Sequence, residues 1–305
     1  MCSPLHQPGG PLTAASRRTF LRATGLTGAA TAAAAAGLAT ATPAAALPQQ
    51  KSADNVASWR PDPDSHRFTF VVIPDTQYLF DGASIHAEPV KASLHYILDH
   101  GRDENIVFLS HLGDLTENGQ PGEFGPLSEA FELLDRRRVG YSVVAGNHDI
   151  KSKTDDQRGR TPYLDAFGPQ RLRRLPTFGG ATPDGYNTYH LFRAAGREWL
   201  VLALDWRLSP ASLAWASGVI AKHPRTPVIL TTHELVYADE YGDEAELSAH
   251  GKHLWDELIA GNDQIFLTST ATTGPPPAPL APTPRATTYS CTSPTTRTVT
   301  TAAAR

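Results

Sequence analysis

The chain has 305 residues and a formal net charge of −4, with 27 lysines and arginines against 31 aspartates and glutamates. This small negative charge gives no indication of binding to nucleic acid or to an anionic membrane surface. The two cysteines are Cys2 and Cys291, so the sequence between them offers neither disulfides nor thiolate metal ligands. The length allows one large domain or two ordinary ones.

Residues 1–46 have the composition of an export signal. The segment 16–22, SRRTFLR, resembles the twin-arginine export motif, and an alanine-rich stretch leads from it to the small-residue site at 44–46. The alternative is an alanine-rich membrane anchor, although the stretch is weakly apolar for a spanning helix. Residues 47–66 are rich in Pro, Gln, Ser and Asp, which is typical of a linker. We therefore expect export by the twin-arginine machinery and a secreted or cell-surface location.

From residue 67 onward, the sequence predicts alternating strands and helices. Short apolar runs predict strands at 68–73, 105–109, 141–145, 189–192, 198–204, 227–230 and from 264 onward. Helical spacing of apolar residues predicts helices at 88–100, 127–138, 162–167, 211–222 and 244–259. Repeated strand, helix, strand units imply right-handed crossovers and a largely parallel sheet. The excursion 158–185, rich in Arg, Pro and Gly, is a candidate substrate loop.

Polar side chains follow four of the predicted strands. They are Asp75 and Gln77, Asp114, Asn147 with His148 and Asp149, and His233. In an open α/β sheet, ligands bind at this carboxyl edge of the strands. Carboxylate and amide oxygens mixed with imidazole suit divalent Mn, Fe or Zn. The carboxylate in Gly113-Asp114 can bridge two ions about 3.5 to 4 Å apart, so the sequence predicts two divalent metal ions.

These segments resemble the motifs of the calcineurin-like metallophosphoesterases. Residues 74–77 (PDTQ) stand at the family's Asp-x-His, 113–117 (GDLTE) at its Gly-Asp motif, 146–149 (GNHD) at its Gly-Asn-His-Asp/Glu motif, and 232–233 (TH) at its isolated histidine. The resemblance covers residue 68 to about residue 267. It implies a four-layer α/β/β/α sandwich formed by a domain at 67–267.

The resemblance also implies a division of the ligands between two metals. Asp75 and Gln77 would bind the first metal, Asn147 and His233 would bind the second, and Asp114 would bridge them. Gln77 stands where the family has a histidine. Because an amide oxygen is a weaker, neutral ligand, the first site is expected to hold its metal loosely.

Catalytic roles follow from the same resemblance. His148 would act as the general acid, with Asp149 orienting its ring, and a hydroxide held between the metals would attack the ester in line. Glu117 stands where purple acid phosphatases have a tyrosine, which argues against that branch. His111 could support the site or be a hydrogen-bonded core histidine, and Asp205 could line the cleft.

The family's last motif, Gly-His-x-His, is absent after the strand that begins at 264. Residues 268–305 are mostly Thr, Pro, Ala, Ser and Arg, without Asp, Glu or Lys. One interpretation is a Thr/Pro linker of mucin type. The other is a shifted reading frame, because codons allowed for 269–275 can read Asn-Gly-His-Tyr-Trp-Pro in another frame. We hypothesise a frameshift near 267–269, which predicts a disordered tail at 268–305 and missing or replaced terminal strands; the nucleotide sequence there tests it.

The sequence therefore predicts a secreted metal-dependent phosphoesterase that hydrolyses a phosphomonoester or phosphodiester, impaired by loss of the final Gly-His. One alternative is a non-catalytic exported protein that binds metal or phosphate, which Gln77 and the lost motif favour. Another is an exported structural or adhesive protein with a Thr/Pro stalk. The basic loop 158–174 hints at an anionic substrate, although surface arginines in loops are usually only solvated.

Overall fold

The computed structural model describes residues 59–150, 153–238, 245–273, 288–291 and 297–302. The expected signal segment 1–46 and the first part of the expected linker 47–66 lie outside these residues. Among the described helices, none has both the length and the apolar character needed to cross a bilayer.

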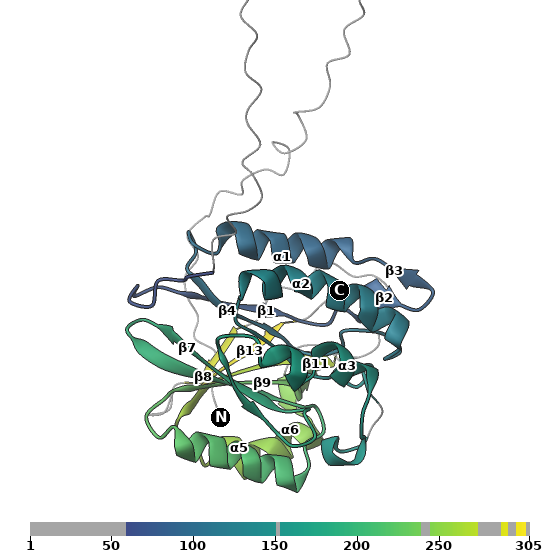
Figure 1. The fold of residues 1–305 in the computed structure, drawn as a ribbon. Helices are drawn as coiled ribbons and strands as arrows, with labels where there is room; N and C mark the ends of the chain where they lie inside the picture. The colour runs from purple at the N-terminus through teal and green to yellow at the C-terminus, as the bar shows by residue number, and fades with distance from the viewer. Residues whose placement is uncertain (1–58, 151–152, 239–244, 274–287, 292–296, 303–305) are drawn as a thin grey trace, which may run out of the picture. The chain divides into compact units, whose positions relative to one another are not determined.

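The first half of the described chain forms a small parallel sheet covered by two helices (Figure 1). The strand order is β1-β4-β5, with bounds β1 Thr69–Ile73, β4 Ile106–His111 and β5 Tyr141–Val143. The crossovers between them contain α1 Glu88–His100 and α2 Pro121–Arg137. A small hairpin, β2 Phe80–Asp81 with β3 Ser84–Ile85, follows β1.

Helix α2 begins earlier than the predicted helix at 127–138. Gln120 and Glu123 form a capping box at its start, and Pro121 occupies the first turn, where its missing N–H is not needed. Leu127, Phe131 and other apolar residues of α2 then pack on the small sheet. The capping residues carry the start signal, which apolar periodicity alone does not reveal.

The second half forms a larger mixed sheet of order β12-β13-β11-β9-β8-β7-β6. Its strands are β6 Phe178–Ala181, β7 Thr188–Ala194, β8 Arg197–Leu204, β9 Val228–Ala238, β11 Ile265–Thr273, β12 Thr288–Cys291 and β13 Arg297–Ala302, with β10 Ala245–Leu247 paired to β9. Strands β8, β9 and β11 are parallel, whereas β7 joins antiparallel. Helices α5 Pro210–Lys222 and α6 Ala249–Leu254 pack on the outer face.

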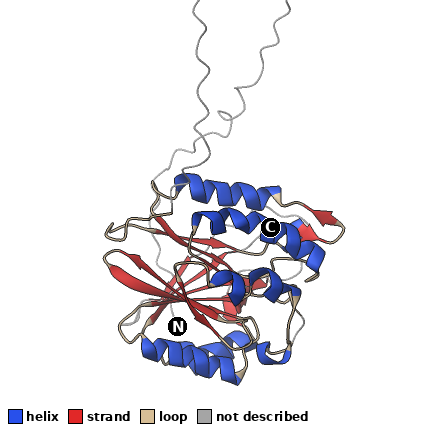
Figure 2. Ribbon diagram, in the orientation of Figure 1, coloured by secondary structure: helices blue, strands red, loops and turns tan. Residues whose placement is uncertain are grey.

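The inner faces of the two sheets share an aromatic core. The ring of Phe108 on β4 stacks on Phe70 of β1 at 5.7 Å and on Phe192 of β7 at 5.6 Å. Val107, Val201 and Ile229 complete the buried contact. Figure 2 shows helices on opposite sides of the strands. The four-layer α/β/β/α architecture expected from the family resemblance is therefore confirmed.

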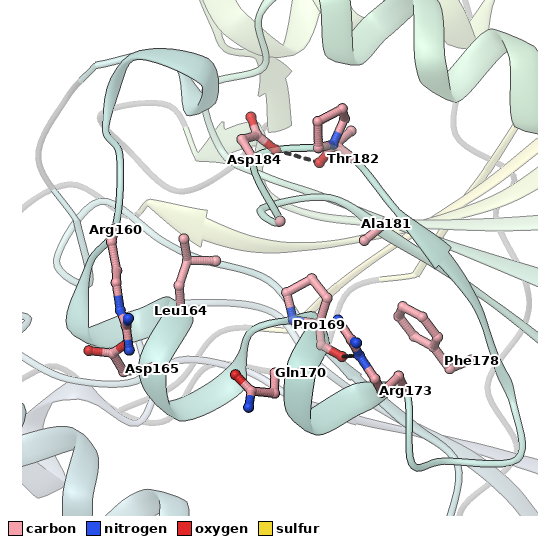
Figure 3. Close-up of a pocket in the computed structure, with 12 residues that line it drawn as sticks. Arg160, Leu164, Asp165, Pro169, Gln170, Arg173, Phe178, Ala181, Thr182 and Asp184 are labelled. Atoms are coloured by element: carbon pink, nitrogen blue, oxygen red, sulfur yellow. Dashed lines mark hydrogen bonds and ion pairs between the residues drawn. The ribbon is translucent and has the colours of Figure 1, made fainter.

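The excursion between β5 and β7 is partly helical. It contains η2 Asp155–Gln157, α3 Pro162–Phe167 and α4 Pro169–Leu172. A hollow of about 550 Å³ lies against α3, α4 and β6 (Figure 3). Its arginines already have partners: Arg160 pairs with Asp165, and Arg173 Nε donates to the Pro169 carbonyl at 3.2 Å. None of the predicted metal ligands lines this hollow.

The carboxyl-terminal region differs from the expectation of disorder after 267. Strand β11 continues to Thr273, and its buried residues include Thr268, Ser269 and Thr270. Strand β13 then pairs in parallel with β11, and β12 pairs antiparallel with β13. Threonine and valine are β-branched and favour strands, which accounts for strand formation by this composition. The described parts of 268–305 thus form strands where a disordered tail was expected, whereas the domain boundary at 267 stays a prediction.

The predicted helix 244–259 is also corrected. The described chain first forms the short strand β10, then α6, and ends in a π-helical turn at η3 Trp255–Ile259. The Ser248 side chain caps α6 by accepting the Gly251 N–H at 2.9 Å. This serine separates the strand from the helix.

Candidate metal centre

Three predicted ligands follow the three strands of the small sheet. Asp75 comes shortly after β1, Asp114 after β4 and Asn147 after β5. Because these strands are parallel, their carboxyl ends meet at one edge. The loops are tied together by the Thr76 N–H, which donates to the Asp114 carbonyl at 2.9 Å.

The fourth ligand, His233, comes from the larger sheet. The sequence predicted a strand that ends at 230, before His233. In the structure β9 continues to Ala238, so His233 lies within the strand. In the pairing with β11, Thr232 faces Thr270 and Glu234 faces Ala271, so His233 is an extra residue, as in a β-bulge. The Thr270 hydroxyl donates to the His233 carbonyl at 2.7 Å and accepts from the Leu235 N–H at 3.1 Å. Thr270, which belongs to the Thr/Pro/Ala-rich segment 268–305, therefore supports the bulge.

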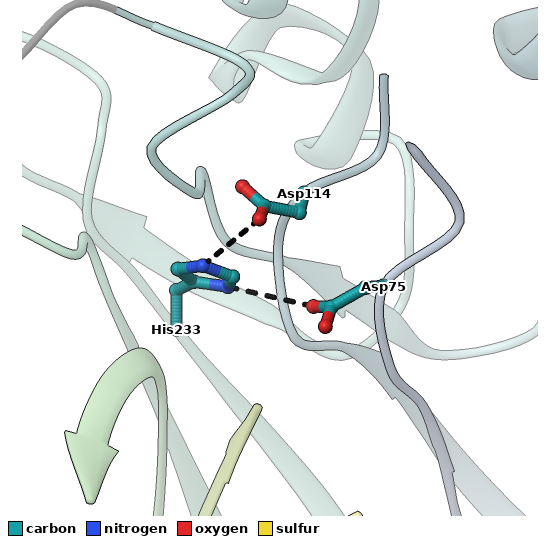
Figure 4. Close-up of side chains that lie close together, drawn as sticks. All are labelled: Asp75, Asp114 and His233. Atoms are coloured by element: carbon teal, nitrogen blue, oxygen red, sulfur yellow. Dashed lines mark ion pairs between the residues drawn. The ribbon is translucent and has the colours of Figure 1, made fainter. Parts of the chain in front are cut away.

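The bulge brings the imidazole between the two aspartates (Figure 4). His233 Nε2 lies 3.3 Å from Asp114 Oδ2, and Nδ1 lies 3.7 Å from Asp75 Oδ1. Asn147 Oδ1 lies 3.0 Å from the same Nε2. One ligand atom from each of Asp75, Asp114 and His233 falls within 4.8 Å of the others, a spacing that can hold a metal ion.

The donor set fits a divalent cation. His233 Nδ1 donates to the Leu112 carbonyl at 2.9 Å, so Nε2 is the nitrogen that faces the oxygens of Asp114 and Asn147. Backbone fixation of the other ring nitrogen is typical of metal-binding histidines. Asp75 Oδ1 is buried without a hydrogen-bond partner among the described residues. A cation would satisfy this oxygen and the converging acceptors together.

The cluster perturbs the ionisation of its members. Burial raises the pKa of Asp75 to about 6, with the Asp114 carboxylate adding to this and His233 opposing it. Burial opposes protonation of His233, but its hydrogen bond to Asp114 and the charges of Asp114 and Asp75 raise its pKa to about 9. Burial likewise disfavours the charged form of Asp114, yet the bonds from His233 and His148 hold its pKa below the usual value. The two neighbouring carboxylates therefore favour the protonated form of the His233 ring.

Two glycines allow the loops that carry the ligands to pack closely. Gly113 has φ +96°, and a Cβ there would lie 2.8 Å from His233 Nδ1. A Cβ on Gly146 would lie 2.2 Å from Asp114 Oδ1. Such distances are too short for real carbon atoms, so the two motif glycines are required by the packing of the loops.

His148 and Gln77 lie beside the cluster. The His148 N–H donates to Asp114 Oδ1 at 3.0 Å, and its ring is partly exposed. Its Nδ1 donates to the Glu117 carbonyl at 3.0 Å, which leaves Nε2 available to a substrate. Gln77 is buried at the first position of η1 Gln77–Leu79, two residues after Asp75. Its role as a metal ligand stays a prediction.

Asp149 occupies a different place from the one expected. Its carboxylate accepts hydrogen bonds from the N–H groups of Leu115 at 2.9 Å, Thr116 at 3.0 Å and Gly146 at 2.9 Å. It therefore ties the two motif loops together, and Glu117 is the residue that contacts the His148 ring. Burial and the nearby Asp114 carboxylate raise the pKa of Asp149 to about 7, against the effect of these N–H donors.

His111 is a buried core histidine that links two loops. Its ring lies 3.2 Å from the Thr76 hydroxyl and accepts from the Gly113 N–H at 3.3 Å. Burial, reinforced by the neighbouring His233, lowers its pKa to about 3. A neutral ring is therefore expected here, in a supporting position behind the ligands.

Sequence reasoning missed the contacts made by Glu117, Arg158 and Asp205. Glu117 Oε1 lies 3.4 Å from His148 Nδ1, and Arg158 Nη1 forms a buried ion pair with Asp205 Oδ1 at 2.8 Å. The sequence did indicate that Asp205 could line the site, because it follows a strand, β8, that ends at the same sheet edge as the ligands. It gave no indication that Arg158 is the partner of Asp205, because loop residues show no periodic pattern.

Comparison with known proteins agrees with this geometry. Residues 68–265 match the calcineurin-like phosphoesterase family. The chain is 25% identical over 206 residues to an uncharacterized Bacillus subtilis (strain 168) protein, YvnB, and this match covers 67% of the chain but only 15% of that relative. The chain thus spans a small part of that protein.

Two solved structures resemble the chain. A dimetal phosphatase from Danio rerio is 14% identical with a TM-score of 0.50, covering 78% of this chain and 87% of that one. The protein TT1561 of Thermus thermophilus is 12% identical with a TM-score of 0.45, covering 75% and 87%. Since the family match spans well over half of the sequence and includes every predicted ligand, the chain belongs to the calcineurin-like phosphoesterase family of phosphoric-ester hydrolases.

Proposed function

We propose that this protein hydrolyses a phosphomonoester or phosphodiester with two divalent metal ions bound at the meeting point of the two sheets. The observation that carries the proposal is the convergence of His233 Nε2 with oxygens of Asp114 and Asn147, beside Oδ1 of Asp75, which is buried and accepts no hydrogen bond from the described residues. The structural similarity to a dimetal phosphatase from Danio rerio supports the metal count.

The proposed ligands divide as the family motifs suggest. Asp75 and Gln77 would hold the first ion, Asn147 and His233 the second, and Asp114 both. The ions would supply Lewis acidity that stabilises charge on the phosphoryl oxygens and lowers the pKa of the attacking water. The chain itself keeps the ligands in place through the bulge at His233 and the close packing at Gly113 and Gly146.

His148 is proposed to protonate the oxygen of the leaving alcohol. Its backbone N–H is bonded to Asp114, so the ring is held next to the proposed bridging ligand. Its Nδ1 is bonded to the Glu117 carbonyl, so Nε2 is the nitrogen that can transfer the proton. General acid catalysis of this kind contributes about 10²- to 10⁴-fold to rates.

A non-catalytic metal-binding protein is the second candidate, and Gln77 favours it. This amide stands where the family has a histidine, and the sequence lacks the final Gly-His motif. Strands β11 and β13 complete the sheet without supplying that histidine, so we propose that this chain has lower activity than a form with the motif. The frameshift near 267–269 remains our explanation for the loss, and sequencing of the locus tests it.

Export through the twin-arginine pathway, and hence a secreted or cell-surface location, is also part of the proposal. It rests on SRRTFLR at 16–22 and the small residues at 44–46. Fractionation of cells that express the full chain, with Arg17 and Arg18 both changed to Lys as the control, tests it. Retention of the variant inside the cell, with release of the wild type, is the expected result.

Turnover and metal content together test the proposed function. The full chain with Mn²⁺, Fe²⁺ or Zn²⁺ should hydrolyse para-nitrophenyl phosphate or its bis ester. Asp114→Asn should lower kcat/KM by at least about 100-fold, because several kcal/mol of metal-based stabilisation are lost. Asp165→Asn, an exposed aspartate of the hollow in Figure 3, serves as the matched control. Metal uptake without hydrolysis of either ester would support the non-catalytic candidate.

A further inference from the structure

A cavity of about 370 Å³ adjoins the metal centre, and its wall includes both Asn147 and His148. Asn147 contacts His233, so the cavity opens directly beside the ligand cluster. The wall also includes Lys153 and Arg158, from the loop after the third motif. If His148 acts on the leaving oxygen, this cavity is where the leaving alcohol would lie.

Arg158 is held rigidly in that wall. Its side chain is only 3% exposed, and Nη1 is paired with the fully buried Asp205 at 2.8 Å. Its Nε donates to the Lys153 carbonyl at 2.6 Å. The guanidinium also lies over the rings of Tyr186 at 5.3 Å and Trp206 at 5.9 Å. These contacts fix the cation in one orientation, as cation–π and ion-pair contacts do for arginine elsewhere.

One nitrogen of this fixed guanidinium is left without a hydrogen bond by the described part of the chain. Arg158 Nη2 is buried and makes no hydrogen bond to any residue that the structure describes. A buried, unpaired N–H on a charged group is costly, so a structural role alone does not account for it.

We propose that Arg158 binds a second anionic group of the substrate, a carboxylate or a phosphate carried by the leaving alcohol. The assignment rests on the proposed function, because it takes His148 to mark the leaving-group side. Nη2 would donate a charge-assisted hydrogen bond to that anion, and the exposed Lys153 at the same wall adds positive charge. The substrate class is therefore a phosphate ester whose alcohol portion is itself negatively charged.

Non-hydrolysable ligands test this assignment without turnover. Binding of phenylphosphonate and 4-carboxyphenylphosphonate to the full chain with Mn²⁺ is measured by calorimetry. The carboxylated ligand should bind the wild type roughly tenfold more tightly, the effect of one charge-assisted hydrogen bond. This ratio should fall to about one in Arg158→Gln, because the donor is lost. Arg160→Gln removes the same charge from the same loop and should keep the wild-type ratio.

Removal of Arg158 alone leaves Asp205 buried without its partner, which can unfold the protein. The double variant Arg158→Gln, Asp205→Asn removes both charges and is measured beside the single one. Equal affinity of the wild type for the two phosphonates, or an unchanged ratio in the folded variants, would overturn the assignment.

Failure of the proposed function has a different signature. It would be seen as no hydrolysis of para-nitrophenyl phosphate or its bis ester by the metal-loaded wild type. In that case the phosphonate ratio still reports whether Arg158 binds the second anion. Retained hydrolysis with equal phosphonate affinities would instead reject only the assignment of Arg158.

Discussion

His233 Nε2 lies 3.0 Å from Asn147 Oδ1, although the two residues are 86 positions apart and His233 lies in the larger sheet whereas Asn147 follows a strand of the small one. This contact joins the turn after β5 to the bulge in β9. The candidate metal centre therefore depends on the packing of the two sheets as much as on either set of loops.

Replacement of Asn147 should weaken metal binding. Asn147→Ala removes an oxygen that faces His233 Nε2, and we expect the affinity for the second ion to fall by at least roughly tenfold, since losses of 10- to 100-fold are typical even for indirect supports of a site. Metal titration followed by elemental analysis measures this. Asn262→Ala, at the end of the last helical turn, is the control and should bind metal as the wild type does.

A methyl group at Gly146 should disrupt the metal centre although no ligand residue is itself replaced. The added Cβ of Gly146→Ala would lie 2.2 Å from Asp114 Oδ1, so the carboxylate has to move. We expect loss of metal uptake. Gly218→Ala in α5, where a Cβ meets nothing within 4 Å, should bind metal normally and gain about 0.5 to 1 kcal/mol of stability. Normal metal content in both variants would contradict the packing argument.

Replacement of Asp149 should lower stability, whereas replacement of His148 should lower activity. Asp149→Asn weakens an acceptor that binds three backbone N–H groups, and we expect a loss of about 3 kcal/mol in the free energy of unfolding. Urea unfolding at pH 8, above the pKa of about 7 that burial gives this carboxyl, measures it. His148→Gln should instead retain stability and lose activity mainly on esters with poor leaving groups. A reversed pattern would restore the originally expected catalytic role of Asp149.

His190 should make the fold sensitive to acid. Burial lowers its pKa from 6.5 to about 3, so between these values the unfolded state binds more protons than the folded state. Stability contributed by the neutral ring is therefore complete above pH 6.5 and decreases as the pH falls. The stability difference between wild type and His190→Gln should narrow by about 1.4 kcal/mol per pH unit below 6.5. Urea unfolding at pH 7.5, 6 and 5 measures it; parallel pH profiles would refute it.

The sequence predicted the positions of Asp75, Asp114 and Asn147 because each follows a short apolar strand. Parallel strands bring such residues to one edge by geometry alone. His233 was also identified, but its bulge was not, since a bulge depends on the register against β11 and on the Thr270 side chain. A bulge adds one residue opposite its partner strand, and the apolar pattern of β9 alone does not mark where that residue stands.

The contacts of Asp149 and Arg158 were not predicted, and for a common reason. Both residues act through partners supplied by distant loops: backbone N–H groups of Leu115 and Thr116 for Asp149, and the carboxylate of Asp205 for Arg158. The motif at 146–149 relates Asp149 to its sequence neighbour His148, and Arg158 lies outside the four motifs. Only the folded arrangement shows which groups they contact.

The bulged His233 has a mechanical consequence for the fold. An ion held by Asp75, Asp114 and His233 would act as a cross-link between the two sheets, in a chain whose cysteines both lie outside the family segment. Ligand binding to the folded state alone raises stability by mass action. Removal of the ion by a chelator would then remove this cross-link as well as the cofactor. The free energy of unfolding should therefore fall on chelation, even without substrate.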